Sequence, residues 1–114
     1  MADLLREDIL KAMHVAAERM GLDLEDLQEM IGDVIEDCTT KSKTLQEAIA
    51  TSDIATIKAI AHDIKGSTAN YGLDEASSLA KSIEGECENQ PTDTAAKLAD
   101  YFVQLSSLDL ESTR

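Results

Sequence analysis

Apolar residues recur every three or four positions along nearly the whole chain, which is the spacing of one buried face of an α-helix. Five such segments can be followed, and no segment shows the sustained two-residue alternation of a half-buried strand. The pattern therefore predicts an all-α protein. In chain order, the apolar positions are Leu5, Ile9, Met13, Ala16 and Met20; Leu24, Leu27, Ile31, Val34, Cys38, Leu45 and Ile49; Ile57, Ile60, Ile64 and Tyr71; Leu73, Ala76, Leu79, Ala80 and Ile83; and Leu98, Phe102, Leu105 and Leu108.

Glycine, proline and capping residues mark the ends of these segments. Gly21 ends the first segment, and Ser52 or Asp53 caps the helix that follows. Gly72 is well placed to stop that helix as the residue just beyond its end. The clearest loop is residues 89–93, which contain the only proline of the chain.

Short links between amphipathic helices favour antiparallel neighbours. We therefore expect an up-and-down four-helix bundle over residues 22–110, with an additional N-terminal helix over residues 1–20 that covers one end or one face. A chain of 114 residues is long enough for one core, so residues 1–114 are expected to form a single domain. The polar stretch 39–44 predicts a bend or a frayed segment in the second helix.

Charge and composition exclude several classes of function. The chain has 23 acidic and 10 basic residues, a net charge of −13, which argues against binding to nucleic acid or to anionic membranes. The chain has no run of 18 apolar residues, which is the length that a membrane-spanning helix needs. Residues 1–20 do not resemble a signal peptide. Cys38 and Cys87 are in no metal-ligand spacing, which favours reduced thiols and a cytoplasmic location.

Residues 55–69 differ from the rest of the chain in charge and in side-chain size. At about 100° per residue on a helical wheel, His62 points away from the apolar stripe of its helix. This stretch carries two lysines and one aspartate, a net charge of +1, whereas the remaining residues carry a net charge of −14. The near neighbours of His62 on the wheel are small or cationic. They are Ala55, Lys58, Ala59, Lys65, Gly66 and Ala69.

This neighbourhood gives His62 a possible chemistry. Helical side chains lean toward the N-terminus, so the residue that would overhang His62 is Gly66, which has no side chain. Lys65 leans back toward the imidazole, and Lys58 approaches from the preceding turn. A neutral imidazole is a competent nucleophile, and two lysines would stabilise a phosphoryl group on it. A lone exposed histidine is usually only a surface residue, but the glycine and both lysines favour a phosphoryl acceptor here.

Residues 61–67, Ala-His-Asp-Ile-Lys-Gly-Ser, resemble the histidine-containing phosphotransfer (HPt) domain family. The family pattern is Ala-His-x-Leu/Ile-Lys-Gly-Ser with a glycine shortly after, which here is Gly72. Residues 24–31, 45–49 and Asp53 also resemble the family's approach to its histidine. The resemblance is weak over the first and last helices.

The resemblance implies a phosphocarrier that accepts a phosphoryl group from a receiver-domain aspartate and passes it to another receiver. It makes His62 the phosphoryl acceptor, Lys65 an electrostatic aid and Gly66 the clearance residue. The implied partners are response-regulator receiver domains and a hybrid sensor histidine kinase. Mg²⁺ would be supplied by the receiver, and this chain is expected to hold no cofactor or metal, to have no kinase activity and to be a monomer. The expected partner-binding residues are Ala55, Lys58, Ala59 and Ala69.

Two other interpretations remain open at this point. The chain could be a helical adaptor that binds receivers or other partners through the His62 face without being phosphorylated. It could also be the dimerisation helix of a sensor kinase, although such helices usually have a proline soon after the histidine and residues 63–72 have none. The second histidine, His14, lacks the Lys-Gly pair and is interpreted as structural or incidental. Whether the chain is free-standing or part of a larger kinase stays open as well.

Overall fold

The helices begin and end close to the residues that the sequence pattern marks. The computed structural model describes residues 2–111, and in them the chain forms five α-helices, one short 3-10 helix and no strand. The all-α prediction is therefore confirmed. The elements are α1 (Ala2–Met20), α2 (Leu24–Ala50), α3 (Ile54–Asn70), α4 (Asp74–Gly85), η1 (Cys87–Asn89) and α5 (Thr92–Ser106).

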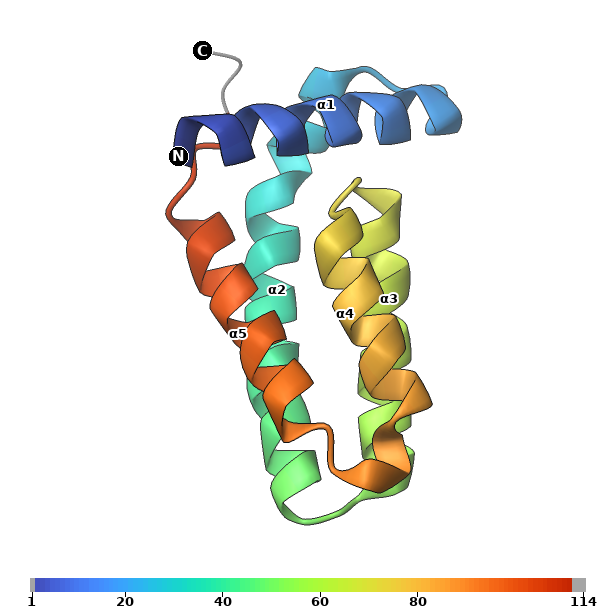
Figure 1. Ribbon diagram of the computed structural model, residues 1–114. Coiled ribbons are helices and arrows are strands. Elements are labelled where there is room, and N and C mark those ends of the chain that lie inside the picture. Colours follow the sequence, from blue (N-terminus) through green and yellow to red (C-terminus); the bar gives the residue numbers. More distant parts are fainter. Residues whose placement is uncertain (1, 112–114) are drawn as a thin grey trace.

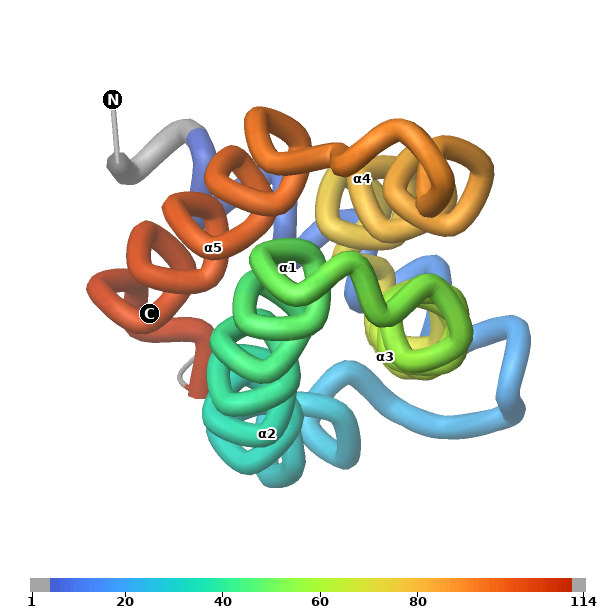
Figure 2. The backbone as a smooth tube through the Cα atoms, turned by 90° about the horizontal axis from the view of Figure 1, so that it is seen from below, coloured from blue at the N-terminus to red at the C-terminus, as the bar shows by residue number. Residues whose placement is uncertain are grey.

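Four of the helices form an up-and-down bundle, as the short links between them predict. Helices α2, α3, α4 and α5 run alternately along the bundle, and α1 lies across one end of it (Figure 1). Seen along the bundle, each of the four packs against two others, in the cyclic order α2, α3, α4, α5 (Figure 2). The additional helix thus covers an end of the bundle rather than a face.

The core is mostly aliphatic. Helix α1 contributes Met13, Ala16 and Ala17 to it, and these close the end of the bundle. One expected core position is wrong, because Met20 is 44% exposed at the last residue of α1. The largest fully buried side chains are Met13, Leu27, Ile31, Leu45, Ile57, Ile64, Leu73, Ile83, Leu98, Phe102, Leu105 and Leu110.

The expected fraying of the second helix over residues 39–44 is also wrong. Helix α2 is unbroken from Leu24 to Ala50. The hydroxyl of Thr39 donates to the carbonyl of Ile35 at 2.7 Å, which satisfies the polar side chain within the helix. Ser42 is buried and continues the buried face between Cys38 and Leu45, so the polar stretch keeps its helical periodicity.

Capping residues set the ends of α3. Of the two candidate caps, Asp53 is the one used, and its carboxylate accepts from the backbone N–H of Thr56 at 3.3 Å. At the other end, Gly72 has a φ of +77° and its N–H donates to the carbonyl of Ala69. The next N–H, of Leu73, donates to the carbonyl of Thr68, which completes the double hydrogen bond of a Schellman end.

Gly72 has a second task, because it touches the backbone of α1. A Cβ at this position would lie 2.5 Å from the carbonyl oxygen of Ala12. Helix α1 therefore rests directly on the turn between α3 and α4, where only a glycine leaves room.

The C-terminal segment returns to α1. The side chain of Arg6 donates to the carbonyl of Asp109 at 2.5 Å, and Leu110 is buried next to it in sequence. A hydrogen bond therefore connects the first and last described segments of the chain at the α1 end of the bundle. None of the helices in residues 2–111 is long and apolar enough to cross a membrane.

Candidate functional site

His62 lies in the middle of α3 and faces solvent. Its side chain is 66% exposed, while Ala61 and Ile64 beside it are buried in the bundle. The helical wheel therefore placed the imidazole correctly, on the side of α3 opposite its core residues. A large partner can reach this ring without any rearrangement of the bundle.

The surface around His62 is low. The space above Gly66 is open, because a Cβ built there would meet no heavy atom within 4 Å apart from its own helix and its chain neighbours. Most of the predicted neighbours of His62 are exposed on the same helix, and Lys65 is half-buried. The exposed ones are Ala55, Lys58, Ala59, Gly66 and Ala69. We call these residues together with His62 and Lys65 the His62 face.

A carboxylate from the neighbouring helix completes the site. Glu84 of α4 reaches across to α3, where its Oε2 lies 3.2 Å from His62 Nδ1 and its Oε1 lies 2.9 Å from Lys65 Nζ. The Lys65 ammonium thus forms an ion pair with Glu84, and the same carboxylate contacts the imidazole of His62. The sequence interpretation had Lys65 lean back toward the imidazole, and the structure adds the carboxylate that contacts both groups.

Glu84 was missed because it is 22 residues from His62 in the sequence. No local pattern links the two residues. The available signal is that Glu84 directly follows Ile83, a core residue of α4, and so stands at the edge of the interface between α3 and α4. Small buried residues of α4, Ala76 and Ala80, let the two helices approach closely.

The backbone near Lys65 is held by side chains of both helices. Ser77 of α4 donates its hydroxyl to the Lys65 carbonyl at 3.1 Å, and Thr68 donates to the carbonyl of Ile64 at 2.7 Å. The bond from Ser77 links the two helices and helps to fix the register between α3 and α4, whereas the bond from Thr68 stays within α3. The Ser77 bond therefore helps to fix the position of Glu84 relative to His62.

The negative charge of Glu84 determines which ring nitrogen of a neutral His62 carries the proton. The hydrogen bond from the Lys65 ammonium lowers the pKa of Glu84, the charge of Lys65 and the contact with His62 act in the same direction, and partial burial opposes them. The carboxylate is thus ionised at neutral pH and can only accept. In a neutral imidazole, Nδ1 must then carry the proton, and Nε2 keeps its lone pair.

The other candidate groups of the sequence do not gather at His62. His14 is on α1 and its Nε2 lies 2.8 Å from Glu18 one turn later. Cys38 and Cys87 are free thiols, and burial raises the pKa of Cys38 to about 11, so this thiol is poorly reactive. Within residues 2–111, no three His, Cys, Asp or Glu side chains are grouped as a metal ion would need.

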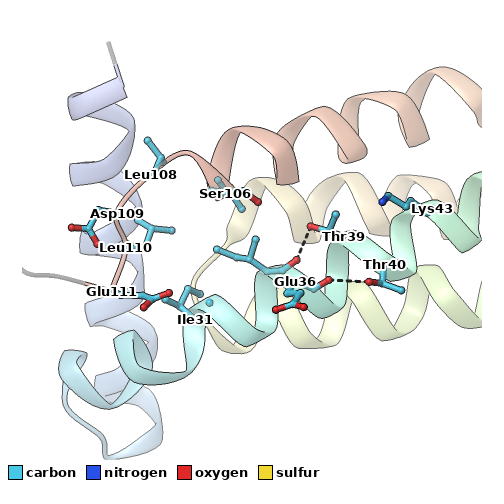
Figure 3. Close-up of a pocket in the computed structure, with 13 residues that line it drawn as sticks. Ile31, Glu36, Thr39, Thr40, Lys43, Ser106, Leu108, Asp109, Leu110 and Glu111 are labelled. Carbon is cyan, nitrogen blue, oxygen red and sulfur yellow. Dashed lines mark hydrogen bonds between the residues drawn. The ribbon is translucent and has the colours of Figure 1, made fainter.

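The hollow drawn in Figure 3 lies on another part of the molecule. It has a volume of about 420 Å³ and is lined by α2 and by the end of α5 with the segment that follows it. Two of its hydroxyls, of Thr39 and Thr40, already donate to carbonyls of α2 (Figure 3). His62 is not part of this hollow, and its own surroundings are an exposed helix face suited to a macromolecular partner.

The structure is thus a four-helix bundle with a solvent-facing histidine in the middle of one helix, α3. The family model of the Hpt domain matches residues 29–112, which is most of the chain. The chain therefore belongs to the Hpt domain family, as the motif around His62 indicates. Membership implies a part in a His-Asp phosphorelay, in which domains of this family interact with receiver domains. No curated protein and no solved structure matches the chain.

The matched residues contain α3, α4 and α5 and most of α2. They include His62, Lys65 and Gly66, and also Glu84. Helix α1 lies outside the matched range. The family match therefore gives no information about how α1 covers the end of the bundle.

Proposed function

We propose that this protein is a phosphocarrier that accepts a phosphoryl group on Nε2 of His62 from the aspartyl phosphate of one receiver domain and passes it to the aspartate of another. The observation that supports this best is the exposed imidazole whose Nδ1 is held by Glu84. An imidazole bound in this way presents an unprotonated Nε2 to solvent.

The proposed transfer is a displacement at phosphorus. The lone pair of Nε2 attacks the phosphorus atom, an N–P bond forms, and the P–O bond to the aspartate breaks with its electrons leaving on the carboxylate. Nδ1 keeps its proton throughout, so the ring becomes positively charged while Glu84 lies against it. The same steps in reverse deliver the group to the carboxylate of the second receiver.

The remaining residues of the His62 face have supporting roles in this proposal. Lys65 and Lys58 lower the energy of the added negative charge, modestly because both side chains are accessible to water. Gly66 leaves clearance above the ring, and the alanines let the receiver approach closely. The receiver supplies Mg²⁺ and most of the stabilisation of the transferred group, so the chain needs no cofactor of its own.

We also infer the setting in which this transfer takes place. Members of the family carry phosphoryl groups without kinase activity, and the phosphoryl group would come from the receiver of a hybrid sensor histidine kinase. The chain would act in the cytoplasm. It would act as a monomer, because a second copy on the His62 face would cover the ring that the receiver must reach.

The first prediction is that His62 is the only residue labelled. When the protein is mixed with a receiver domain phosphorylated by a small-molecule donor, its mass should rise by one phosphate, and the label should be lost in acid and kept in base, as is usual for a phosphoramidate. His62→Gln should abolish the label, and His14→Gln is the matched control that should keep it. Labelling of His62→Gln would contradict the assignment. Binding of the receiver with no label in the wild-type chain would support the adaptor function instead.

A further inference from the structure

Two anions compete for the ammonium of Lys65 once His62 carries a phosphoryl group. In the structure, Lys65 Nζ lies 2.9 Å from Glu84 Oε1, and the other oxygen of the same carboxylate lies 3.2 Å from the imidazole. The negative charge of Glu84 is therefore balanced by Lys65 while the ring is neutral. Among the described residues, no other carboxylate forms an ion pair with Lys65.

Phosphorylation changes this balance. A phosphoryl group brings between about 1.5 and 2 negative charges near neutral pH. It would be attached to the ring nitrogen opposite the one that Glu84 holds, so only the imidazole separates the two anions. Lys65 is one helical turn after His62 on the same face of α3, so its ammonium can pair with either anion, and its contact with one anion weakens its contact with the other.

We propose that Glu84 competes with the phosphoryl group for Lys65, so that phosphorylation makes Lys65 change partner, and the contact that Lys65 gives up with Glu84 reduces the net stabilisation that it gives to phosphohistidine. This inference rests on the proposed function and concerns the control of the same site. Its consequence is that the group is held less tightly on His62 than the two nearby lysines alone would hold it, which favours onward transfer.

The local structure allows such a change of partner. The side chain of Lys65 is 32% exposed and has four rotatable bonds, whereas its carbonyl is fixed by Ser77. Only the side chain has to move. Glu84 is less exposed, at 21%, and stays attached to Nδ1 of His62, so it remains close to the ring after Lys65 leaves.

The experiment removes the charge of Glu84 while keeping an acceptor for Nδ1. In Glu84→Gln, the amide oxygen can still accept from Nδ1–H, but Lys65 is released. The phosphorylated protein is separated from the receiver and its phosphohistidine is followed over time. We expect a half-life about three- to tenfold longer than in the wild type, and a shift of the transfer equilibrium with a receiver toward His62 by a similar factor.

Two controls separate this effect from a general change of charge or structure. Glu75→Gln removes one carboxylate from an exposed site in the first turn of α4 and should leave the half-life unchanged. Glu84→Ala also removes the charge and should lengthen the half-life as well, although it removes the hydrogen bond to His62. A half-life that is unchanged or shorter in both Glu84 variants would overturn the proposal.

A Lys65→Ala background tests whether Glu84 acts through Lys65. There the gain from Glu84→Gln should become smaller, because only direct repulsion between the carboxylate and the phosphoryl group is relieved. An equal gain in both backgrounds would contradict the change of partner. If the wild-type chain takes no label on His62, the proposed function itself fails; if it takes the label and Glu84→Gln behaves as wild type, only this inference fails.

Discussion

The tautomer of His62 depends on a single carboxylate. Because an ionised Glu84 can only accept, it holds the proton on Nδ1, whereas an imidazole in water has no such constraint. We predict that two-bond ¹H–¹⁵N correlation spectra show neutral His62 as the Nδ1–H form in the wild type, and that Glu84→Ala shifts the population toward Nε2–H. His14 serves as the internal control, since it should be unaffected. An Nε2–H form in the wild type would contradict the hydrogen bond between Nδ1 and Glu84.

Clearance and stability can be separated at Gly66. Its φ is not positive and its Cβ position is open, so Gly66→Ala should stabilise α3 by up to about 1 kcal/mol. A longer side chain would lean toward the N-terminus over the imidazole. Gly66→Gln should therefore give a folded protein that transfers poorly, by as much as about a hundredfold, since displacement on the order of 1 Å can have that effect.

Thermal melts and transfer rates measure both quantities in the same samples. Ala96→Gln, at an exposed position of α5, is the matched control and should transfer at the wild-type rate. A full rate in Gly66→Gln would show that the glycine gives no clearance. Unfolding of this variant would mean that Gly66 is needed for packing instead.

At the scale of helices, the turn between α3 and α4 is a support for α1. Gly72 and Gly21 both have positive φ, +77° and +74°, but a Cβ on Gly21 would meet nothing within 4 Å, whereas one on Gly72 would collide with the backbone of Ala12 and Met13. Gly21→Ala should therefore cost only the left-handed strain, about 1–2 kcal/mol. Gly72→Ala should cost about 3 kcal/mol or more, because α1 must also move.

Urea unfolding of the two alanine variants measures this difference directly. Hydrogen exchange should also show faster exchange of the α1 amides in Gly72→Ala than in Gly21→Ala. Equal losses of stability in the two variants would mean that α1 is not held by this contact.

The helices could be predicted because their apolar stripes are local. The stripe of α1 shows which of its residues are buried, but the same stripe fits a helix that lies along the bundle and one that lies across its end. The unbroken α2 could not be foreseen at Thr39, since a threonine hydroxyl bonded within the helix looks, in sequence, like a polar interruption.

The candidate site, too, could be predicted only where its residues are close together in the sequence. His62, Lys65 and Gly66 share one turn of α3, so spacing alone places them together. Glu84 comes from another helix, and its position depends on the register between α3 and α4, which is set by packing around residues such as Ala80. Periodicity within one helix contains no information about that register.

For the molecule as a whole, burial of two ionisable groups predicts a loss of stability in alkali. Burial raises the pKa of Cys38 from 9.0 to about 11 and is also the main cause that raises the pKa of Tyr101 from 10.0 to about 12. Both groups stay protonated in the folded protein at a pH where the unfolded chain loses their protons. Their contribution is therefore complete below pH 9 and declines as the pH rises toward 12, first through Cys38 and then through Tyr101.

Urea unfolding at pH 7, 9 and 10.5 tests this expectation. The Cys38 difference alone corresponds to about 2–3 kcal/mol when fully developed. Cys38→Ala should be less stable at pH 7 but should lose less stability between pH 9 and 10.5 than the wild type. Parallel losses in the two proteins would show that Cys38 is not the group responsible.

The bond between Arg6 and Asp109 has a topological consequence. Since the first and last segments of the described chain meet at the α1 end, a short peptide linker could join them and make the backbone a closed ring. Such a ring could be reopened at the exposed residues Glu88–Asn89, at the far end of the bundle from α1. The resulting circular permutant would keep α3 and α4 intact, and with them His62 and Glu84, while its new ends would emerge at the opposite pole of the molecule.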